Sequence, residues 1–324
     1  SQTVYLADSD AAWIDRFLQE WFTSWLLRIA LPILSAISGY LMLRDWQQDW
    51  SFYERKVRRR IRSLLIPFLS VSLLTILAYA CIQTLPGSAG FFTPPLIRDW
   101  SLVQWWDRLL INPLNYPIYF LRDLFLVALL APLLGWLLRP RALALPTLLA
   151  LLVLWWVQQD LWIWNIRLLA WFSVGGALAL HPKWRWRPGQ GLLITALVLW
   201  LLLSAYGAWD ATSSGDRSRE LNHGVKLLGM SVFFYGVLAI PRAGQLNHWL
   251  LKIAPWCFPL FLLHNPVVNL IKKGLMRIVG DSPGVPTIVW LGAWTGATTL
   301  LVWVIAPLGS RFGGRFWALI TGGR

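Results

Sequence analysis

The chain has 324 residues, of which 57% are hydrophobic and only 14% are charged. Soluble domains carry about 25% charged residues, so the composition excludes that class and indicates a membrane protein. The formal net charge of +14 is explained by membrane orientation and anionic lipid headgroups, so the lipid bilayer is an expected partner and nucleic acid is not.

Nine segments are apolar and long enough to be candidate transmembrane helices, because about 20 residues cross the hydrocarbon. In chain order they are 24–43, 64–85, 117–138, 142–158, 165–180, 191–208, 224–240, 251–271 and 285–307. Several contain proline, which membrane helices tolerate when neighbouring groups satisfy the freed carbonyl. The sequence therefore predicts an all-α, polytopic helical bundle with about nine membrane helices in a single domain, residues 1–324.

Basic residues set the predicted orientation of these spans. Residues 44–63 hold seven Lys and Arg, and loops of this kind stay in the cytoplasm. Residues 1–23 then form an outer segment and residues 86–116 an outer loop. The chain starts with no methionine, basic region or apolar stretch able to export residues 1–23. We therefore expect either a cleaved signal peptide or a further transmembrane helix upstream.

The basic run ERKVRRRIRSLL (54–65) has two readings. It sets topology and binds anionic lipid, which needs no specific site. Alternatively, Arg58, Arg59 and Arg62 form a phosphate clamp at the membrane surface, because guanidinium groups suit bidentate contacts to phosphate. The sequence leaves both readings open.

Arg122 and Asp123 stand side by side inside the third candidate span. At 1.5 Å of rise per residue, Arg122 lies roughly 9 Å below Tyr116, in the outer third of the membrane. Adjacent helix residues point about 100° apart. We therefore expect each charge to pair across a helix interface, for instance Asp123 with Arg28 or Arg167. A purely structural interhelical ion pair is the alternative to a functional site.

Four further ionisable residues are expected at a similar depth: Arg28, Arg167, Lys226 and His264. Such groups usually face the bundle interior or a wet cavity and mark a site. The competing interpretation is that the three cations snorkel to the outer headgroups. The histidine is equally well explained as a hydrogen-bonded core residue or as a catalytic one.

The cysteines and the other histidines give no metal-binding pattern. Cys81 and Cys257 lie near opposite ends of different spans and form no CxxC motif, so we expect both to be unpaired and no disulfide framework. His181, His223 and His248 are scattered along the chain. We therefore expect no metal site.

Five stretches together resemble the membrane-bound acyltransferase-3 family. They are RIALPILSAISGYLM (28–42), ERKVRRRIRSLLIPF (54–68), YPIYFLRDLFLVALLAPLL (116–134), FPLFLLHNPVVNLIKKGL (258–275) and LITGGR (319–324). They are similar to an Arg-led helix ending in SGY, a basic RxxR stretch, an FLRDL helix, an LHxP helix and a common C-terminal ending. Each match alone is weak, and their order along the chain makes the set specific.

The resemblance implies ten helices in the bacterial cytoplasmic (inner) membrane and transfer of an acyl group, commonly acetyl. The resemblance also implies acyl-CoA, commonly acetyl-CoA, as the co-substrate, no bound cofactor, and a carbohydrate or glycan as the acceptor. The family's first helix carries an Arg-x10-His motif with its leading catalytic histidine, and no residue here matches it. The resemblance places Arg28, Arg122, Asp123 and His264 at the catalytic site and Arg58, Arg59 and Arg62 at the acyl-CoA site.

Two other functions stay open at this point. A transporter or flippase of a lipid-linked sugar would use the same buried charges as a relay, although no inverted repeat is visible. An inactive membrane scaffold would be consistent with the unmatched histidine motif.

Overall fold

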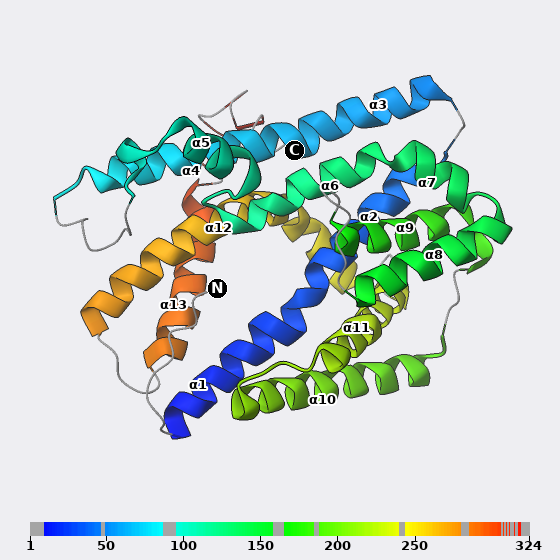
Figure 1. Ribbon diagram of the computed structural model, residues 1–324. Helices are drawn as coiled ribbons and strands as arrows, with labels where there is room; N and C mark the ends of the chain where they lie inside the picture. Colours follow the sequence, from blue (N-terminus) through cyan, green and yellow to red (C-terminus); the bar gives the residue numbers. More distant parts are fainter. Residues whose placement is uncertain are drawn as a thin grey trace. The chain divides into compact units, whose positions relative to one another are not determined.

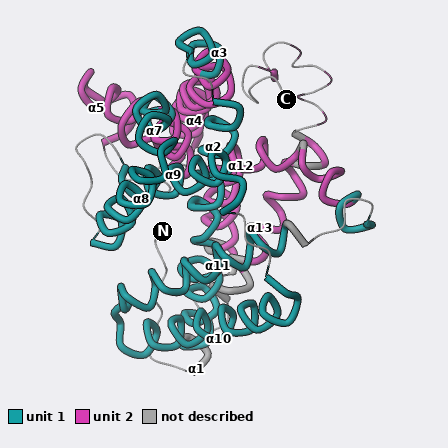
Figure 2. Tube along the Cα trace, turned by 90° about the vertical axis from the view of Figure 1, so that its right-hand side faces the viewer, with its two compact units in different colours: residues 1–56, 126–248, 281–287 teal, residues 57–125, 249–280, 288–324 magenta. Residues whose placement is uncertain are grey.

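The computed structural model describes residues 10–46, 49–86, 95–157, 165–184, 188–239, 244–279 and 285–305, with residues 307, 309, 311, 314, 317 and 318. Within these ranges every regular element is a helix (Figure 1). This confirms the predicted all-α class. The chain divides into two compact units, which we describe separately. Unit 1 comprises residues 1–56, 126–248 and 281–287, and unit 2 comprises residues 57–125, 249–280 and 288–324 (Figure 2).

Unit 1 begins with a helix that runs from Asp10 to Leu43 through four successive elements. These are α1 (Asp10–Glu20), the π-helical turn η1 (Trp21–Leu26), the 3-10 turn η2 (Leu27–Ile29) and α2 (Ala30–Leu43). The first span was therefore predicted too short, since Trp13–Leu43 has the length and hydropathy of one span. The prediction began at residue 24 because the polar side chains of Asp15, Gln19 and Glu20 lower the local hydropathy, whereas the fold buries all three.

The tightest helix packing in unit 1 joins α2 to α9 (Ile166–Leu180). Small residues let the two backbones touch: a Cβ atom on Gly39 would lie 1.9 Å from the Phe172 carbonyl oxygen, and one on Gly175 would lie 1.8 Å from that of Ala36. Ser35 Oγ donates a hydrogen bond to the Leu168 carbonyl at 2.7 Å. Close approach through small residues is a common way for membrane helices to associate.

This packing predicts that Gly39→Ala destabilises the protein. The new methyl group would overlap Phe172 backbone atoms, and overpacking of this kind costs about 1–3 kcal/mol. Gly236→Ala is the matched control, because a Cβ atom there would meet no atom within 4 Å and alanine is the better helix former. We expect a lower unfolding temperature in detergent for Gly39→Ala and an unchanged or higher one for Gly236→Ala. Equal unfolding temperatures would contradict the close α2–α9 contact.

Four further helices of the described chain lie wholly within unit 1. They are α7 (Ala131–Leu138), α8 (Arg141–Trp156), α10 (Gln190–Ser214) and α11 (Arg219–Ala239). Helix α8 packs on α9, and α10 packs on both α11 and η1 (Figure 1). One apolar cluster collects buried side chains from η2, α2, α8, α9 and α11: Ile29, Ile33, Ala36, Trp155, Ala170, Trp171 and Met230.

Helix α3 (Trp50–Arg60) continues through a π-helical turn, η3 (Ile61–Leu65), into α4 (Ile66–Gln83). The stretch 44–63, predicted to be a basic cytoplasmic loop, is therefore helical over most of its length, and its cytoplasmic location stays a prediction. Charged side chains lowered its hydropathy without interrupting the helix, because Arg, Lys and Glu are good helix formers. Trp50–Gln83 as a whole has the length and hydropathy of a span.

Unit 2 also contains the predicted outer loop and two late helices. Within residues 86–116 the chain forms α5 (Leu102–Trp106) and the π-helical turn η6 (Asp107–Ile111), so this loop is partly helical. Helix α6 (Tyr119–Leu129) begins in this unit and ends in unit 1. Most of α12 (Gln245–Val279) and α13 (Val285–Leu300) belong to unit 2.

All nine candidate segments are helical over most of their described residues. Three described helices are long and apolar enough to cross a membrane, or up to five if each of two bent pairs is one span. One bend, of 56°, separates α6 from α7 at Leu130, two residues before Pro132, whose nitrogen has no hydrogen to donate to the preceding turn. The chain is thus a helical integral membrane protein, and the count of nine spans stays a prediction. Cys81 and Cys257 are both free, as predicted.

Candidate functional site

The Arg122–Asp123 pair lies near the start of α6, after a 3-10 turn at Tyr116–Ile118. Arg122 Nε donates to Asp123 Oδ1 at 2.8 Å, and Nη2 lies 2.6 Å from the same oxygen. Arg122 Nη1 donates to the carbonyl oxygens of Leu110, at 2.9 Å, and of Ile111. The Asp123 side chain is only 7% exposed.

This geometry corrects the expectation that the two charges do not neutralise one another. The directions of adjacent helix residues differ by about 100°, but the arginine side chain is long enough to fold back onto its neighbour. The two Nη1 hydrogens are satisfied by carbonyls of η6, which sequence spacing gave no reason to place beside α6. Arg122 therefore joins the predicted outer loop to the helix that carries Asp123.

His264 lies on α12 with a defined orientation of its ring. Its Nδ1 is 3.0 Å from the Leu260 carbonyl oxygen and 2.8 Å from that of Phe261. Carbonyl oxygens only accept hydrogen bonds, so Nδ1 carries a proton, and in the neutral ring Nε2 keeps a lone pair. The ring stacks on Trp294 of α13, with centroids 5.1 Å apart and planes 22° apart. His264 is thus held in the tautomer that presents Nε2 as a proton acceptor.

The segments carrying these two motifs are neighbours within unit 2. Asn115 Nδ2, just before α6, donates to the Leu262 carbonyl at 2.6 Å. The rings of Phe120 and Phe261 meet edge to face with centroids 6.2 Å apart. The structure therefore brings Arg122 and Asp123 onto a helix beside the one with His264. Sequence reasoning missed Asn115, which is fully buried; an amide ahead of a Tyr-Pro turn was its only signal.

The other predicted charges gather in unit 1. Arg28 lies in η2, Arg167 in the first turn of α9 and Lys226 in the second turn of α11. The Lys226 ammonium interacts electrostatically with both guanidinium groups. Arg28, which was placed with the catalytic residues, thus belongs to a group of three cations that we call the cation cluster (Arg28, Arg167 and Lys226).

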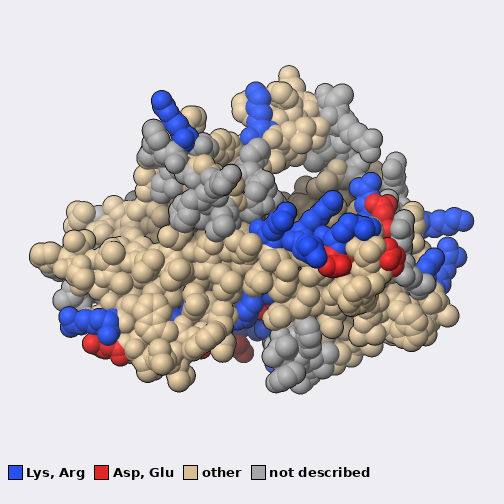
Figure 3. All heavy atoms as spheres, turned by 90° about the horizontal axis from the view of Figure 1, so that it is seen from above, with Lys and Arg blue, Asp and Glu red and all other residues tan. Residues whose placement is uncertain are grey.

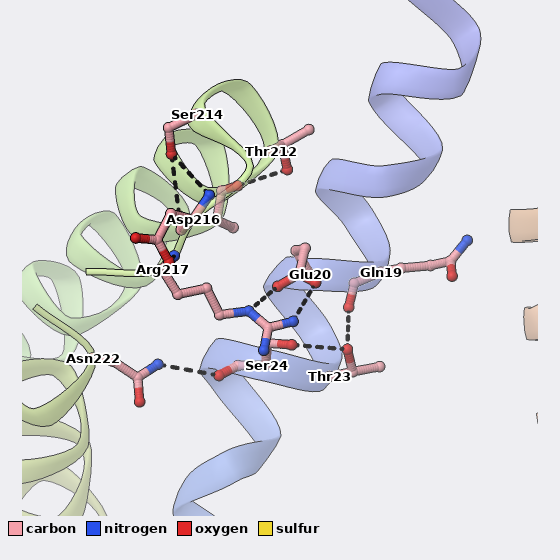
Figure 4. A network of polar contacts seen from close by, with 10 residues as sticks. Gln19, Glu20, Thr23, Ser24, Thr212, Ser214, Asp216, Arg217 and Asn222 are labelled. Atoms are coloured by element: carbon pink, nitrogen blue, oxygen red, sulfur yellow. Dashed lines mark hydrogen bonds and ion pairs between the residues drawn. The ribbon is translucent and has the colours of Figure 1, made fainter. Parts of the chain in front are cut away.

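A partly buried polar network connects the N-terminal helix to the α10–α11 turn, and the sequence did not reveal it (Figure 4). Glu20 receives two hydrogen bonds from Arg217, from Nε at 2.9 Å and from Nη2 at 2.6 Å. Asn222 Nδ2 donates to the Ser24 carbonyl at 3.5 Å. Charge-assisted bidentate bonds of this kind are strong and orient both partners. Only the presence of polar residues ahead of the first apolar run signalled the network.

The basic strip on α3 and η3 is exposed at the three positions predicted to bind acyl-CoA, Arg58, Arg59 and Arg62. Figure 3 shows Lys and Arg gathered on the face seen from above, with few acids.

Two hydrogen bonds in unit 1 position the start of α3. Tyr53 Oη donates to the Leu129 carbonyl at 3.0 Å and Lys56 Nζ to the Leu41 carbonyl at 2.9 Å. These contacts fix the start of α3. On the exposed Asp49 just before it, hydrogen bonds from Ser51 lower the carboxyl pKa.

Similarity to known proteins identifies the family of this chain. The family model described as an acyltransferase domain, that of the acyltransferase-3 family, matches residues 3–307. The chain belongs to the acyltransferase-3 family. The chain is 38% identical over 145 residues to the succinoglycan biosynthesis protein ExoH of Rhizobium meliloti (strain 1021). The aligned region covers 43% of this chain and 36% of that relative. No solved structure matches this chain.

The acyltransferase-3 match covers the helices that carry every predicted site residue. Arg28, Arg58, Arg59, Arg62, Arg122, Asp123 and His264 all fall within residues 3–307. Their individual roles stay predictions. In the described part of this acyltransferase-family chain, no group of three or more His, Cys, Asp or Glu is arranged to hold a metal ion.

Proposed function

We propose that the protein is a membrane O-acyltransferase, moving an acyl group, expected to be acetyl, from cytoplasmic acyl-CoA to a hydroxyl group of an extracytoplasmic carbohydrate. The family match over residues 3–307 carries this proposal. The similarity to a succinoglycan biosynthesis protein favours a polysaccharide or another cell-envelope glycan as the acceptor. The expected location is the bacterial inner membrane, with the spans arranged as the sequence predicts.

The reaction needs a base and a leaving group. As the acceptor oxygen attacks the thioester carbonyl carbon, its proton passes to a base, the carbon–sulfur bond breaks, and the CoA thiolate leaves and is protonated. The Nε2 lone pair of His264 suits the role of base, since backbone carbonyls hold the proton on Nδ1. The Arg122–Asp123 pair on the neighbouring helix supplies a fixed polar group for orienting the acceptor.

The donor is proposed to bind at Arg58, Arg59 and Arg62. CoA is a polyanion, and exposed guanidinium groups bind phosphate in a bidentate manner. We expect Arg59→Ala with Arg62→Ala to raise the apparent KM for acetyl-CoA by about tenfold or more, because each lost charge-assisted bond is worth about 1.5–3 kcal/mol. The apparent KM for the acceptor should change little.

A second pair of basic residues provides the control for the donor site. Arg139 and Arg141 are also exposed and are predicted to lie on the cytoplasmic side. Their double alanine variant should keep the wild-type KM for acetyl-CoA. If both double variants behave like the wild-type protein, the basic run serves topology and lipid binding only.

The function itself is tested with the full-length protein in inverted membrane vesicles. Transfer of label from external acetyl-CoA to glycan enclosed in the vesicle lumen, which corresponds to the extracytoplasmic side, is measured beside uptake of lipid-linked sugar. Acyl transfer without uptake supports the proposal. Uptake without transfer supports the transporter alternative, and neither activity supports the scaffold alternative.

A further inference from the structure

Asn115 stands directly before the 3-10 turn that leads into α6, and its side chain does not cap that turn. Asparagine at such a position normally accepts a hydrogen bond from the N–H group of the second or third residue of the turn. Here the second residue, Pro117, has no N–H group. The third residue, Ile118, donates to the backbone carbonyl of Asn115 at 3.1 Å. Both local donors are therefore unavailable to the Asn115 side chain.

A proline in α12 explains the hydrogen bond that this side chain does make. In an α-helix the carbonyl of one residue accepts from the N–H group four residues later. Four residues after Leu262 stands Pro266, which has no N–H group, although the helix continues from Trp256 to Leu275. Asn115 Nδ2 donates to the freed Leu262 carbonyl at 2.6 Å. The amide thus replaces the donor that Pro266 lacks, two residues before His264.

This hydrogen bond fixes the direction of the Asn115 amide. A carbonyl oxygen only accepts hydrogen bonds, so the amide nitrogen faces Leu262 and the amide oxygen, Oδ1, points away from it. Asn115 is fully buried, and Oδ1 has no hydrogen-bond donor among the residues that the structure describes. Buried polar atoms are normally satisfied, because an unmet hydrogen bond costs free energy. Oδ1 is therefore suited to a donor that a ligand supplies.

Asn115 lies where the two elements of the candidate site meet. Arg122 and Asp123 follow it in the first turns of α6, and its hydrogen bond reaches α12 two residues before His264. All four residues belong to unit 2. In surroundings that exclude water, a single hydrogen bond has a larger effect than at the surface. Oδ1 is thus placed to influence a molecule that binds between the proposed base and the proposed orienting pair.

The chemistry of Oδ1 limits the ligand that it can take. The atom is uncharged and only accepts hydrogen bonds, so its ligand carries an uncharged O–H or N–H group. Two substrates of the proposed reaction have such groups: the glycan acceptor in its hydroxyls, and CoA in the amides of its pantetheine arm. The reacting hydroxyl has to reach the base, and Asn115 is bonded to the helix that carries the base. This favours the glycan.

We propose that Asn115 is an acceptor-binding residue whose Oδ1 accepts a hydrogen bond from a hydroxyl group of the glycan, while its Nδ2 ties α12 to the start of α6. One side chain then sets both the position of the His264 helix and the position of the substrate. The inference rests on the proposed function for the identity of the substrate. The binding of a hydroxyl group at Oδ1 does not depend on acyl transfer.

The two roles of the amide are separated by a second substitution. Asn115→Leu alone removes Oδ1 but also leaves the Leu262 carbonyl without its donor, so we expect it to lower the unfolding temperature. Pro266→Ala restores a helical N–H group to that carbonyl. The informative comparison is therefore Asn115→Leu with Pro266→Ala against Pro266→Ala alone. We expect these two proteins to unfold at nearly the same temperature.

Binding is measured by saturation-transfer NMR on the full-length protein in phosphatidylcholine nanodiscs. The probe is an oligosaccharide of succinoglycan, treated with alkali so that its hydroxyl groups carry no ester. We expect the double variant to bind it about tenfold more weakly than Pro266→Ala does, the effect of one buried hydrogen bond. In acyl transfer the KM for the oligosaccharide should rise by the same factor, with the KM for acetyl-CoA unchanged. Asn269→Leu, the same change at an exposed position of α12, should bind the probe like the wild-type protein.

The other outcomes overturn the proposal. Equal affinity of the double variant and Pro266→Ala would show that Asn115 only satisfies Leu262 and that water occupies Oδ1. A rise in the KM for acetyl-CoA alone would assign Oδ1 to the pantetheine arm, and a wild-type protein that does not bind the oligosaccharide would leave Oδ1 without its ligand. Acyl transfer to the oligosaccharide that does not depend on Asn115 would refute this inference alone. Binding that depends on Asn115, without any acyl transfer, would refute only the proposed function.

Discussion

A protein carrying Arg122→Met together with Asp123→Leu is expected to insert and fold but to transfer no acyl group. Each single change leaves a buried partner uncompensated, and breaking such a pair costs about 3–5 kcal/mol. The double change removes both charges. It still leaves the Leu110 and Ile111 carbonyls without the Arg122 donor, at about 1–3 kcal/mol, so the double variant should be more stable than the Asp123→Leu variant.

The measurement is acyl transfer per folded molecule, with folded protein counted by size-exclusion chromatography in detergent. Arg98→Met with Asp99→Leu is the matched control: it is another adjacent pair in unit 2, 3.6 Å apart and with side chains 80% and 56% exposed. Exposed pairs contribute about 0–1 kcal/mol, so the control should fold and work normally. Wild-type transfer by the Arg122/Asp123 double variant would show that the pair only ties the outer loop to α6.

The sequence predicted which segments are helical much better than it predicted where each helix ends. Long apolar runs identify membrane helices because the hydrocarbon demands internal hydrogen bonds. Asp15, Gln19 and Glu20 break that pattern at the start of the chain. Glu20 is paired with Arg217, almost two hundred residues away, and no local pattern reveals such a partner. The same limit explains why the first helix extends beyond its predicted start.

The candidate site was predictable as a set of residues but not as an arrangement. Charged residues inside apolar runs singled out Arg122, Asp123, His264 and the cation cluster, since such groups are costly in a membrane. The sequence could not predict how these residues group in space, because that depends on which helices become neighbours. Folding places Asn115 against α12 and η6 against Arg122. Both contacts involve loop residues whose positions follow from tertiary packing alone.

His264→Gln is expected to reduce acyl transfer by about 10²–10⁴-fold, the usual contribution of a general base. Glutamine keeps a similar reach and a hydrogen-bond donor for the Leu260 and Phe261 carbonyls, but it provides no basic nitrogen. The stability change should therefore be small, about 1 kcal/mol or less. His248→Gln, at an exposed position of the same helix, should leave both transfer and stability unchanged.

The pH profile distinguishes a base from a core histidine at this position. Protonation of Nε2 removes the lone pair that accepts the acceptor's proton, so wild-type transfer should fall as the pH drops through the titration of His264. The residual transfer of His264→Gln should lack that acid limb. If His264 only packs on Trp294 and hydrogen-bonds to carbonyls within its own helix, the glutamine variant will keep the wild-type profile and rate per folded molecule. In that event the base lies elsewhere, and the fixed tautomer of His264 serves the packing of α12 against α13.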